Sequence, residues 1–353
     1  MAITQKNILL ISPISIKGGK AAFTRNLIEV YQQNCIKFYH IDLVRHRSSN
    51  YYMRVIEHFY NFFAYKIKVI KTLIIKPIDI VQIHTSSYFD FYDLSLVIII
   101  SKLFRKKVIL RHGGGGFPTF YRKANWIKRK YFKWALSLPD KLIVLSDYWH
   151  AYFKDIGIKE PNIFLMPNFV DEERYSIRDK IYDKPTLNIL FMPAKSLIGK
   201  GFFDFKNSII ELAFQNPNVI FHIVGPEVDK HIQGENIHTY KMIFGGKKTE
   251  LFDLCQIYFL PTHAEGFPNS MIEAMAAQMA VITTNIPEIK CLVNDNYDCL
   301  LIDTASELQF KEKFLYLLNN RTKLMEIGKN ARELVVKNYS LKLMSVYLKK
   351  LYA

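Results

Sequence analysis

Short apolar runs alternate with amphipathic stretches along almost the whole chain. The runs are about four to eight residues long and rich in Ile, Leu, Val and Phe, which predicts buried strands. Strands that alternate with helices form doubly wound parallel sheets, so we predict an α/β fold. The expected strands are residues 7–12, 37–43, 78–84, 107–112, 141–146, 187–193, 218–225, 238–245, 256–260 and 281–284.

The stretches between these runs predict helices and a division into two domains. A chain of 353 residues, of which 50% are apolar, can fill two hydrophobic cores. We expect one domain in residues 1–170 and a second in residues 171–338, with the polar stretch 172–185 as their connection. A last amphipathic helix is expected in residues 339–353. Helices are also expected up to Tyr31, at 120–135, at 248–256 and over 306–337.

Residues 263–277, with the sequence HAEGFPNSMIEAMAA, form the most informative stretch. They follow a predicted strand, and Gly266 and Pro268 mark a turn before a helix. The backbone N–H groups of Gly266, Phe267, Asn269 and Ser270 would be free at the helix start, where they favour a phosphate or sugar hydroxyls. We therefore expect a ligand site here.

The same stretch has a simpler interpretation. Ser270 and Glu273 have the spacing of a capping box, in which Glu273 serves only its own helix. Residue spacing alone leaves these two interpretations open.

Composition limits the cellular setting. The cysteines form no Cys-x-x-Cys pair, so we expect neither a zinc site nor a disulfide framework and infer a reducing cytoplasm. The N-terminus enters a predicted strand without a cleavage site, and the longest apolar run, residues 94–103, is too short to span a membrane. We expect a cytoplasmic protein, soluble or peripheral at the inner face of the cell membrane. The four cysteines are Cys35, Cys255, Cys291 and Cys299.

The charge is concentrated in the first half of the chain. Residues 1–168 contain 26 Lys and Arg against 10 Asp and Glu, which accounts for the whole formal charge of +16. A one-sided positive field indicates an anionic partner, which can be a membrane surface, a polyphosphate substrate or nucleic acid.

Residues 105–133 hold ten basic residues and no acidic one, with aromatic residues interleaved. An interfacial helix at anionic lipid and a core-packed helix with a solvated basic face fit this pattern equally. Binding to nucleic acid is the third interpretation of this segment. The sequence contains no recognisable nucleic-acid-binding motif, so we expect no nucleic-acid partner. The candidate membrane or acceptor surface comprises Lys123, Trp126, Lys128, Arg129, Lys130, Lys133 and Trp134.

The landmarks in the second half resemble a known enzyme family. Glu265-x7-Glu273 encloses Gly-Phe-Pro-Asn, and Glu-Ala-Met-Ala and residues 281–284 follow. This arrangement resembles the retaining glycosyltransferases of the GT-B fold, in particular glycosyltransferase family 4. The segment Pro-Asn-Phe-Val-Asp that ends at Asp171 resembles the family's Pro-Asn-Gly-Val-Asp, with Phe169 in place of glycine. The resemblance implies two Rossmann-like domains facing a central cleft, with the final helix crossing back to the first domain.

The resemblance also implies roles for individual residues. The first domain would bind the acceptor and the second the nucleotide-sugar, with Glu273 accepting hydrogen bonds from the ribose hydroxyls. Lys195 and Lys200 match the family's basic pair on the diphosphate, with lysine in the arginine position at Lys195, and His112 would lie near the transferred sugar. The implied catalytic residues are His112, Lys195, Lys200 and Glu265, and the implied donor-binding residues are Gly18, Gly19, Met242, Ile243, Gly266, Phe267, Pro268, Asn269, Ser270 and Glu273.

These roles together lead to a functional expectation. We expect transfer of a sugar from a nucleotide-sugar, UDP favoured, to a hydroxyl of a lipid-linked glycan, with retention, in bacterial surface polysaccharide biosynthesis. No Asp-x-Asp motif is present, so we expect neither a metal nor another cofactor. The alternatives are a non-catalytic GT-B-fold subunit of a membrane-associated complex and a nucleotide-sugar epimerase.

Overall fold

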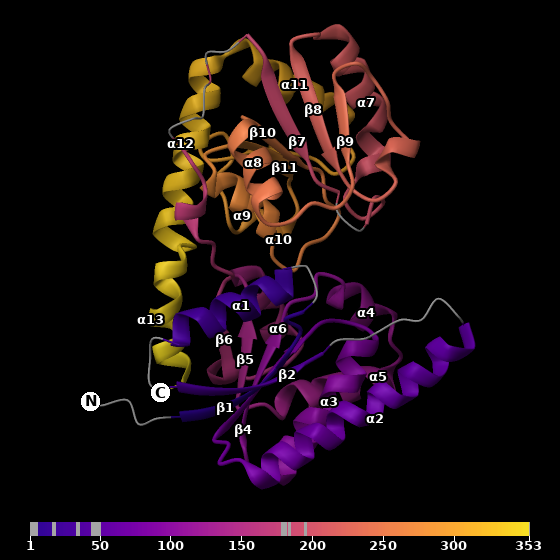
Figure 1. Cartoon of the computed structure of the whole chain (residues 1–353), viewed down its shortest axis with the longest axis vertical. Coiled ribbons are helices and arrows are strands. Elements are labelled where there is room, and N and C mark those ends of the chain that lie inside the picture. The colour runs from indigo at the N-terminus through magenta and orange to yellow at the C-terminus, as the bar shows by residue number, and fades with distance from the viewer. Residues whose placement is uncertain are drawn as a thin grey trace. The chain divides into compact units, whose positions relative to one another are not determined.

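The computed structural model describes residues 6–15, 19–32, 36–43, 51–177, 182, 185–193 and 196–352. The chain forms two compact units. Unit 1 comprises Met1–Asn168 and Met344–Ala353, and unit 2 comprises Phe169–Leu343. Each unit contains one six-stranded sheet whose strands are all parallel (Figure 1). The predicted α/β class is therefore confirmed.

The sheet of unit 1 has the strand order β2-β1-β3-β4-β5-β6. All six residues of β3 are buried, as expected for a strand whose two faces are covered. Helices α2, α3 and α5 lie on one face of this sheet, and α1 lies on the other (Figure 1). The strands are β1 (Lys6–Ser12), β2 (Ile36–Asp42), β3 (Ile80–Thr85), β4 (Lys107–His112), β5 (Lys141–Val144) and β6 (Ile163–Leu165).

Seven α-helices and a 3₁₀ turn in the described residues complete the elements of unit 1. The last of them, α13, buries Met344, Leu348 and Leu351, and its Tyr352 hydroxyl donates a hydrogen bond to Oε1 of Gln82 on β3. A segment that follows unit 2 in sequence thus packs within unit 1. The elements are α1 (Gly19–Gln32), α2 (Tyr51–Ile75), α3 (Phe89–Leu103), α4 (Phe117–Lys123), α5 (Trp126–Ser137), α6 (Asp147–Asp155), η1 (Glu160–Asn162) and α13 (Leu341–Tyr352).

The sheet of unit 2 has the strand order β12-β11-β10-β7-β8-β9. Strands β7 and β10 are neighbours, with Ile257 paired to Ile189, although two other strands separate them in sequence. The strand order therefore reverses direction between β7 and β10, which makes this position a topological switch point. The strands are β7 (Leu187–Phe191), β8 (Val219–Val224), β9 (Ile237–Tyr240), β10 (Ile257–Leu260), β11 (Ala280–Thr284) and β12 (Leu300–Ile302).

Aromatic rings pack against one another within the core of unit 2. The ring centroids of Phe259 and Phe310 are 4.0 Å apart, and Phe205 meets Phe259 edge-on at 5.1 Å. These rings join β10 to the helices α7 and α11 and fix that strand in the sheet. The helical elements are η2 (Glu172–Arg174), α7 (Phe202–Gln215), η3 (Val228–Lys230), α8 (Gly246–Leu254), α9 (Asn269–Ala276), α10 (Pro287–Lys290), α11 (Glu307–Asn319) and α12 (Arg321–Asn338).

Several boundaries differ from the sequence expectation, and two of the differences have a local reason. The helix expected at 120–135 is two helices, because Asn125 caps α5 by accepting a hydrogen bond from the N–H of Lys128. The helical stretch expected at 306–337 is divided into two helices at Asn320. The Asn320 side chain caps α12 by accepting a hydrogen bond from the N–H of Lys323. The strand expected at 238–245 stops at Tyr240.

Candidate functional site

The candidate donor site lies at the switch point of unit 2, where the loops after β7 and β10 leave the sheet side by side. Ligands of open α/β sheets bind outside the carboxyl ends of the strands at such a point. The loop after β7 contains Lys200, and the loop after β10 contains Glu265. The fold therefore brings two of the expected site residues to one sheet edge.

Gly201 holds these two loops together. Its φ is +68°, and a Cβ built on it would lie 2.1 Å from the carbonyl oxygen of Pro261, so only glycine fits. Two hydrogen bonds to the Gly199 carbonyl reinforce the contact, one from the N–H of His263 at 3.1 Å and one from the Thr262 hydroxyl at 3.3 Å. This backbone contact places Lys200 at the end of β10.

Lys200 and Glu265 form an ion pair. The Lys200 ammonium donates to Oε1 of Glu265, although the two residues are 65 positions apart. The Glu265 side chain is almost buried, and a buried carboxylate needs a cationic partner to stay charged. These two predicted catalytic residues thus contact each other directly.

Glu273 on α9 forms a second ion pair, with Lys248 in the first turn of α8. The Lys248 ammonium also lies 5.3 Å from the centroid of the Phe252 ring. Sequence reasoning missed Lys248. Nothing in its local pattern distinguishes it from the adjacent Lys247, because its partner lies 25 positions further along the chain.

The structure contradicts the capping-box interpretation of Ser270 and Glu273. The N-cap position of α9 is Pro268, Ser270 lies inside the helix, and no described side chain caps this end. The Glu273 carboxylate is bound by Lys248 instead.

One expected amide donor at this helix start is also already used. The N–H of Asn269 donates to the carbonyl of Phe267 at 2.9 Å, so the expectation that it is free is wrong.

A buried tyrosine lies beneath the start of α9. Tyr258 of β10 is fully buried, and its hydroxyl lies near Ser270 and the two site carboxylates. Burial raises the pKa of Tyr258 far above its ordinary value, and the charges of Glu273 and Glu265 raise it further. Burial likewise raises the pKa of Tyr175, which also lies near Glu273. Both tyrosines therefore stay neutral beneath the site.

The structure describes only some of the other residues that were expected in the donor site. Met242 and Ile243 follow β9 and are half-buried. They belong to unit 2, which also contains the two ion pairs. Gly19 is the first residue of α1 in unit 1. Gly18 and Lys195 lie outside the described residues.

The loop after β1 is held by Asp42 at the end of β2. Its carboxylate accepts hydrogen bonds from the N–H groups of Ile14 at 2.9 Å and Ser15 at 3.1 Å, and Arg25 donates to the Ile14 carbonyl. A carboxylate at this position in a dinucleotide-binding fold would hold a ribose. Here it holds the chain's own loop, in agreement with the missing Gly-x-Gly-x-x-Gly pattern.

His112 ends β4 inside an aromatic cluster. Its side chain is buried, and its ring centroid lies 4.8 Å from that of Phe117 and 5.3 Å from that of Phe153. Its part in a reaction remains a prediction. The adjacent Arg111 is also buried, stacks 3.9 Å from the Phe23 ring and donates to Asn168, while burial lowers its pKa to about 9.

The basic and aromatic residues of α4 and α5 lie on the surface of unit 1. Helix α5 packs on the core through Phe132, Ala135 and Leu136, whereas Trp126 is 66% exposed and Trp134 is 48% exposed. The helix is therefore core-packed, as one interpretation held, and it still presents large apolar rings to solvent. Lys123, Lys128, Arg129, Lys130 and Lys133 are exposed beside these rings.

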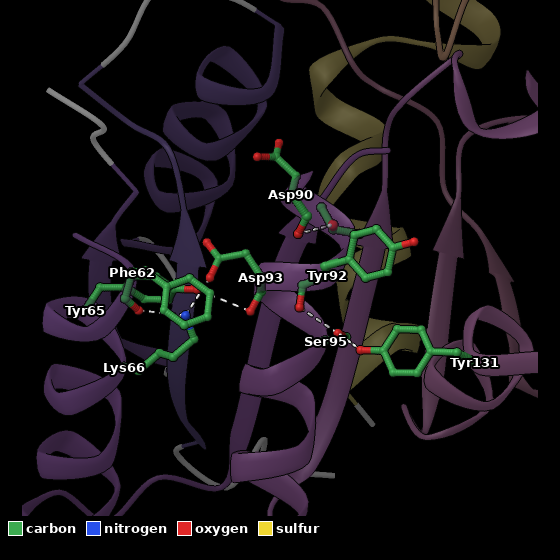
Figure 2. Close-up of polar contacts among 9 residues, drawn as sticks. Phe62, Tyr65, Lys66, Asp90, Tyr92, Asp93, Ser95 and Tyr131 are labelled. Carbon is green, nitrogen blue, oxygen red and sulfur yellow. Dashed lines mark hydrogen bonds and ion pairs between the residues drawn. The ribbon is translucent and has the colours of Figure 1, made fainter. Parts of the chain in front are cut away.

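Polar contacts bind α5, α3 and α2 into one layer (Figure 2). The Lys66 ammonium on α2 pairs with Asp93 on α3 and donates to the Phe62 carbonyl at 2.7 Å. On the other side of α3, the hydroxyls of Ser95 and Tyr131 are hydrogen-bonded. These contacts fix the orientation of α5 and thus of its exposed surface.

Two further features concern metals and membranes. Within the described ranges, no three His, Cys, Asp or Glu side chains gather in a way that could hold a metal ion. None of the helices in that part of the chain is both long enough and apolar enough to cross a membrane.

Comparisons with known proteins match both units. The model of glycosyl transferases group 1 matches residues 174–334, and that of glycosyltransferase family 4 matches residues 28–174. The chain is 23% identical over 241 residues to N,N'-diacetylbacillosaminyl-diphospho-undecaprenol alpha-1,3-N-acetylgalactosaminyltransferase of Campylobacter jejuni, covering 62% of the chain and 63% of that protein. It is 26% identical over 264 residues to the capsular polysaccharide biosynthesis glycosyltransferase CapM of Staphylococcus aureus, covering 72% of the chain and 58% of that protein. The match spans less than two thirds of either relative.

Solved structures show the same fold at low sequence identity. Sucrose-phosphate synthase of Thermosynechococcus elongatus matches with a TM-score of 0.77 and 15% identity, covering 98% of each chain. The Anabaena protein HepE in complex with UDP and glucose matches with a TM-score of 0.75 and 14% identity, covering 98% of this chain and 99% of that one. With the two family models, these similarities show that the chain is a member of glycosyltransferase family 4 with the GT-B fold.

Proposed function

We propose that the protein transfers a sugar from a UDP-sugar to a hydroxyl of a lipid-linked glycan, with retention of the anomeric configuration. The observation that carries this proposal is the pairing of Lys200 with Glu265 at the switch point of unit 2, next to Glu273 on α9. These are the residues that the family resemblance assigns to the donor. The name of the Campylobacter relative, a glycosyltransferase with a diphospho-undecaprenol acceptor, supports the acceptor class.

Each residue in this site has a chemical task in the proposed reaction. Glu273 accepts hydrogen bonds from the ribose hydroxyls, since a carboxylate can accept two. Lys200, together with Lys195, neutralises the negative charge that the departing diphosphate gathers as the glycosidic bond breaks, without a metal ion. The acceptor hydroxyl attacks from the face that the diphosphate leaves, and Glu265 stabilises the oxocarbenium-like sugar.

The surface of α4 and α5 supports a location at the membrane. Exposed tryptophans beside exposed lysines suit the interface of an anionic bilayer, where a lipid-linked acceptor would lie. We therefore propose that the protein works in the cytoplasm, at the inner face of the cell membrane, in surface polysaccharide biosynthesis. The name of the Staphylococcus relative, a capsular polysaccharide enzyme, is consistent with this setting.

Thermal unfolding with nucleotides tests the donor site. UDP, GDP, ADP, CMP and dTDP are added with and without magnesium to the wild type and to Glu273→Gln, with the exposed Glu250→Gln as a matched control. A ligand at 100 times its dissociation constant adds about 2.7 kcal/mol to the free energy of unfolding, which is readily detected. We expect UDP to stabilise the wild type and Glu250→Gln without magnesium, and Glu273→Gln to lose most of the effect.

Product analysis then separates the proposal from its alternatives. Incubation with UDP-sugars and a polyprenyl-diphosphate-linked sugar should give a longer glycan whose new linkage has the donor's anomeric configuration. Conversion of the UDP-sugar into its epimer would identify an epimerase. UDP binding without turnover would indicate a non-catalytic subunit, and failure to bind any of these nucleotides would refute the donor site.

A further inference from the structure

We propose that Lys248 is a positioning residue for nucleotide binding, which acts through Glu273 by holding that carboxylate in place beside an anionic ligand. The inference rests on the proposed function, because it assigns a role to the carboxylate that would hold the ribose. Lys248 itself belongs to none of the sequence landmarks that led to that function.

The ion pair is more buried than a fully exposed lysine pair on the surface. The side chains of Lys248 and Glu273 are only 23% and 25% exposed, whereas both members of the Lys342–Glu173 pair are about 70% exposed. An exposed pair is screened by water and holds its side chains weakly, and a half-buried pair holds them more firmly. Lys248 can therefore fix the orientation of Glu273.

An aromatic support keeps Lys248 in this position. The ammonium lies 5.3 Å from the ring of Phe252, which is fully buried and packs on Tyr258 and Tyr175. A cation near an aromatic face gains a further attraction. The ammonium thus lies close both to a ring of the core and to the carboxylate.

The bond uses one of the two carboxylate oxygens. Lys248 binds Oε2 of Glu273, so Oε1 is the oxygen that would be turned to a ligand hydroxyl. A lone carboxylate would repel the diphosphate of the same ligand, and the bound ammonium cancels this repulsion. The pairing of Lys200 with Glu265 does the same for the second carboxylate of the site.

A double-mutant cycle on UDP affinity tests this role. The dissociation constant of UDP is measured by titration calorimetry for the wild type, Lys248→Met, Glu273→Gln and the double variant. We expect Lys248→Met to weaken UDP binding by about tenfold or more, which corresponds to about 1.4 kcal/mol. In the Glu273→Gln background the same substitution should change the affinity by less than about twofold, because the group through which Lys248 acts has lost its charge.

Two controls separate positioning from folding or total charge. Lys248→Arg keeps the charge and should restore most of the affinity, and the exposed neighbour Lys247→Met loses the same charge and should bind UDP like the wild type. The melting temperature of each variant shows that unit 2 is folded.

Three results would overturn the proposal, and they are distinguishable. If Lys248→Met binds UDP like Lys247→Met, Lys248 has no role in binding. If its effect persists at full size in the Glu273→Gln background, Lys248 contacts the nucleotide directly and does not act through Glu273. If the wild type binds neither UDP nor the other nucleotides, the proposed function fails and this inference fails with it.

Discussion

A Cβ added to Gly201 would lie 2.1 Å from the carbonyl oxygen of Pro261, so the loops after β7 and β10 touch through their backbones. Gly201→Ala must move one of these loops and also place alanine at a φ of +68°. We expect it to lower the free energy of unfolding by more than about 2 kcal/mol and to weaken UDP binding, because Lys200 moves with the loop.

Gly245→Ala is a control for the crowding at Gly201, because Gly245 also has a positive φ but an open surrounding. Gly245 has a φ of +61°, but no described atom lies within 4 Å of a Cβ built there. Its ψ of −139° lies outside the left-handed helical region, so the substitution should lose only the cost of this strained backbone, on the order of 1 to 3 kcal/mol, and less than Gly201→Ala loses. Urea unfolding measures both variants, and equal losses would show that the contact with Pro261 is unimportant.

The buried pair of Lys66 and Asp93 gives a second prediction. Asp93→Ala leaves the Lys66 ammonium buried without its carboxylate, so we expect a loss of about 3 kcal/mol in the free energy of unfolding. The double variant Lys66→Met/Asp93→Leu should recover most of this loss, since it removes both charges together.

The exposed pair of Lys154 and Glu160 serves as a control for the buried one. Lys154→Met should change the free energy of unfolding by no more than about 1 kcal/mol. If Asp93→Ala were as mild as Lys154→Met, the pair of Figure 2 would not hold α2 to α3.

Acid should destabilise unit 2 through His222. Its Nδ1 lies 2.9 Å from the Tyr240 hydroxyl and its Nε2 lies 2.9 Å from Oδ1 of Asn188, so the neutral ring can accept from one partner and donate to the other. Burial, with the nearby His238, lowers the pKa of His222 from 6.5 to about 4. Between these values the unfolded chain binds a proton that the folded chain does not, so stability is complete above pH 6.5 and falls as the pH approaches 4.

The size of this effect can be measured by urea unfolding as a function of pH. One titrating group contributes a slope of up to about 1.4 kcal/mol per pH unit. His222→Gln should flatten the curve between pH 6.5 and 4, while substitution of the exposed His231 should leave it unchanged. An unchanged slope in His222→Gln would assign the acid sensitivity to other groups.

The surface of α4 and α5 predicts binding to anionic vesicles. Reversing the charge of Lys128, Arg129 and Lys130 should lower the partition coefficient by more than about tenfold at low salt, since each basic residue near the surface contributes about 1 kcal/mol. Reversal of three exposed lysines in unit 2, at Lys290, Lys329 and Lys337, is the control and should have little effect. Flotation with phosphatidylglycerol vesicles measures both, and equal losses would indicate a response to net charge alone.

The sequence predicted most of the strands, because parallel strands covered on both faces are continuous apolar runs, but it did not predict β6, which has three residues and is only partly buried. It predicted helix ends less well, since Asn125 and Asn320 interrupt helical patterns through side-chain caps that look like ordinary polar positions. Family landmarks identified Lys200 and Glu265 as site residues, but their ion pair appears only in the structure, where the fold brings the two loops together. Lys248 could not be found in this way, because its role depends on α8 and α9 lying next to each other in space.

The return of α13 to unit 1 has a consequence for protein synthesis. The ribosome makes residues 1–168 first, then all of residues 169–343, and only then the helix whose Tyr352 hydroxyl binds Gln82. Until that helix emerges, the newly made first unit lacks the apolar cover that Met344, Leu348 and Leu351 provide. Completion of its folding must therefore await translation of the second unit, and exposure of this surface in the nascent chain is a point at which a chaperone would act.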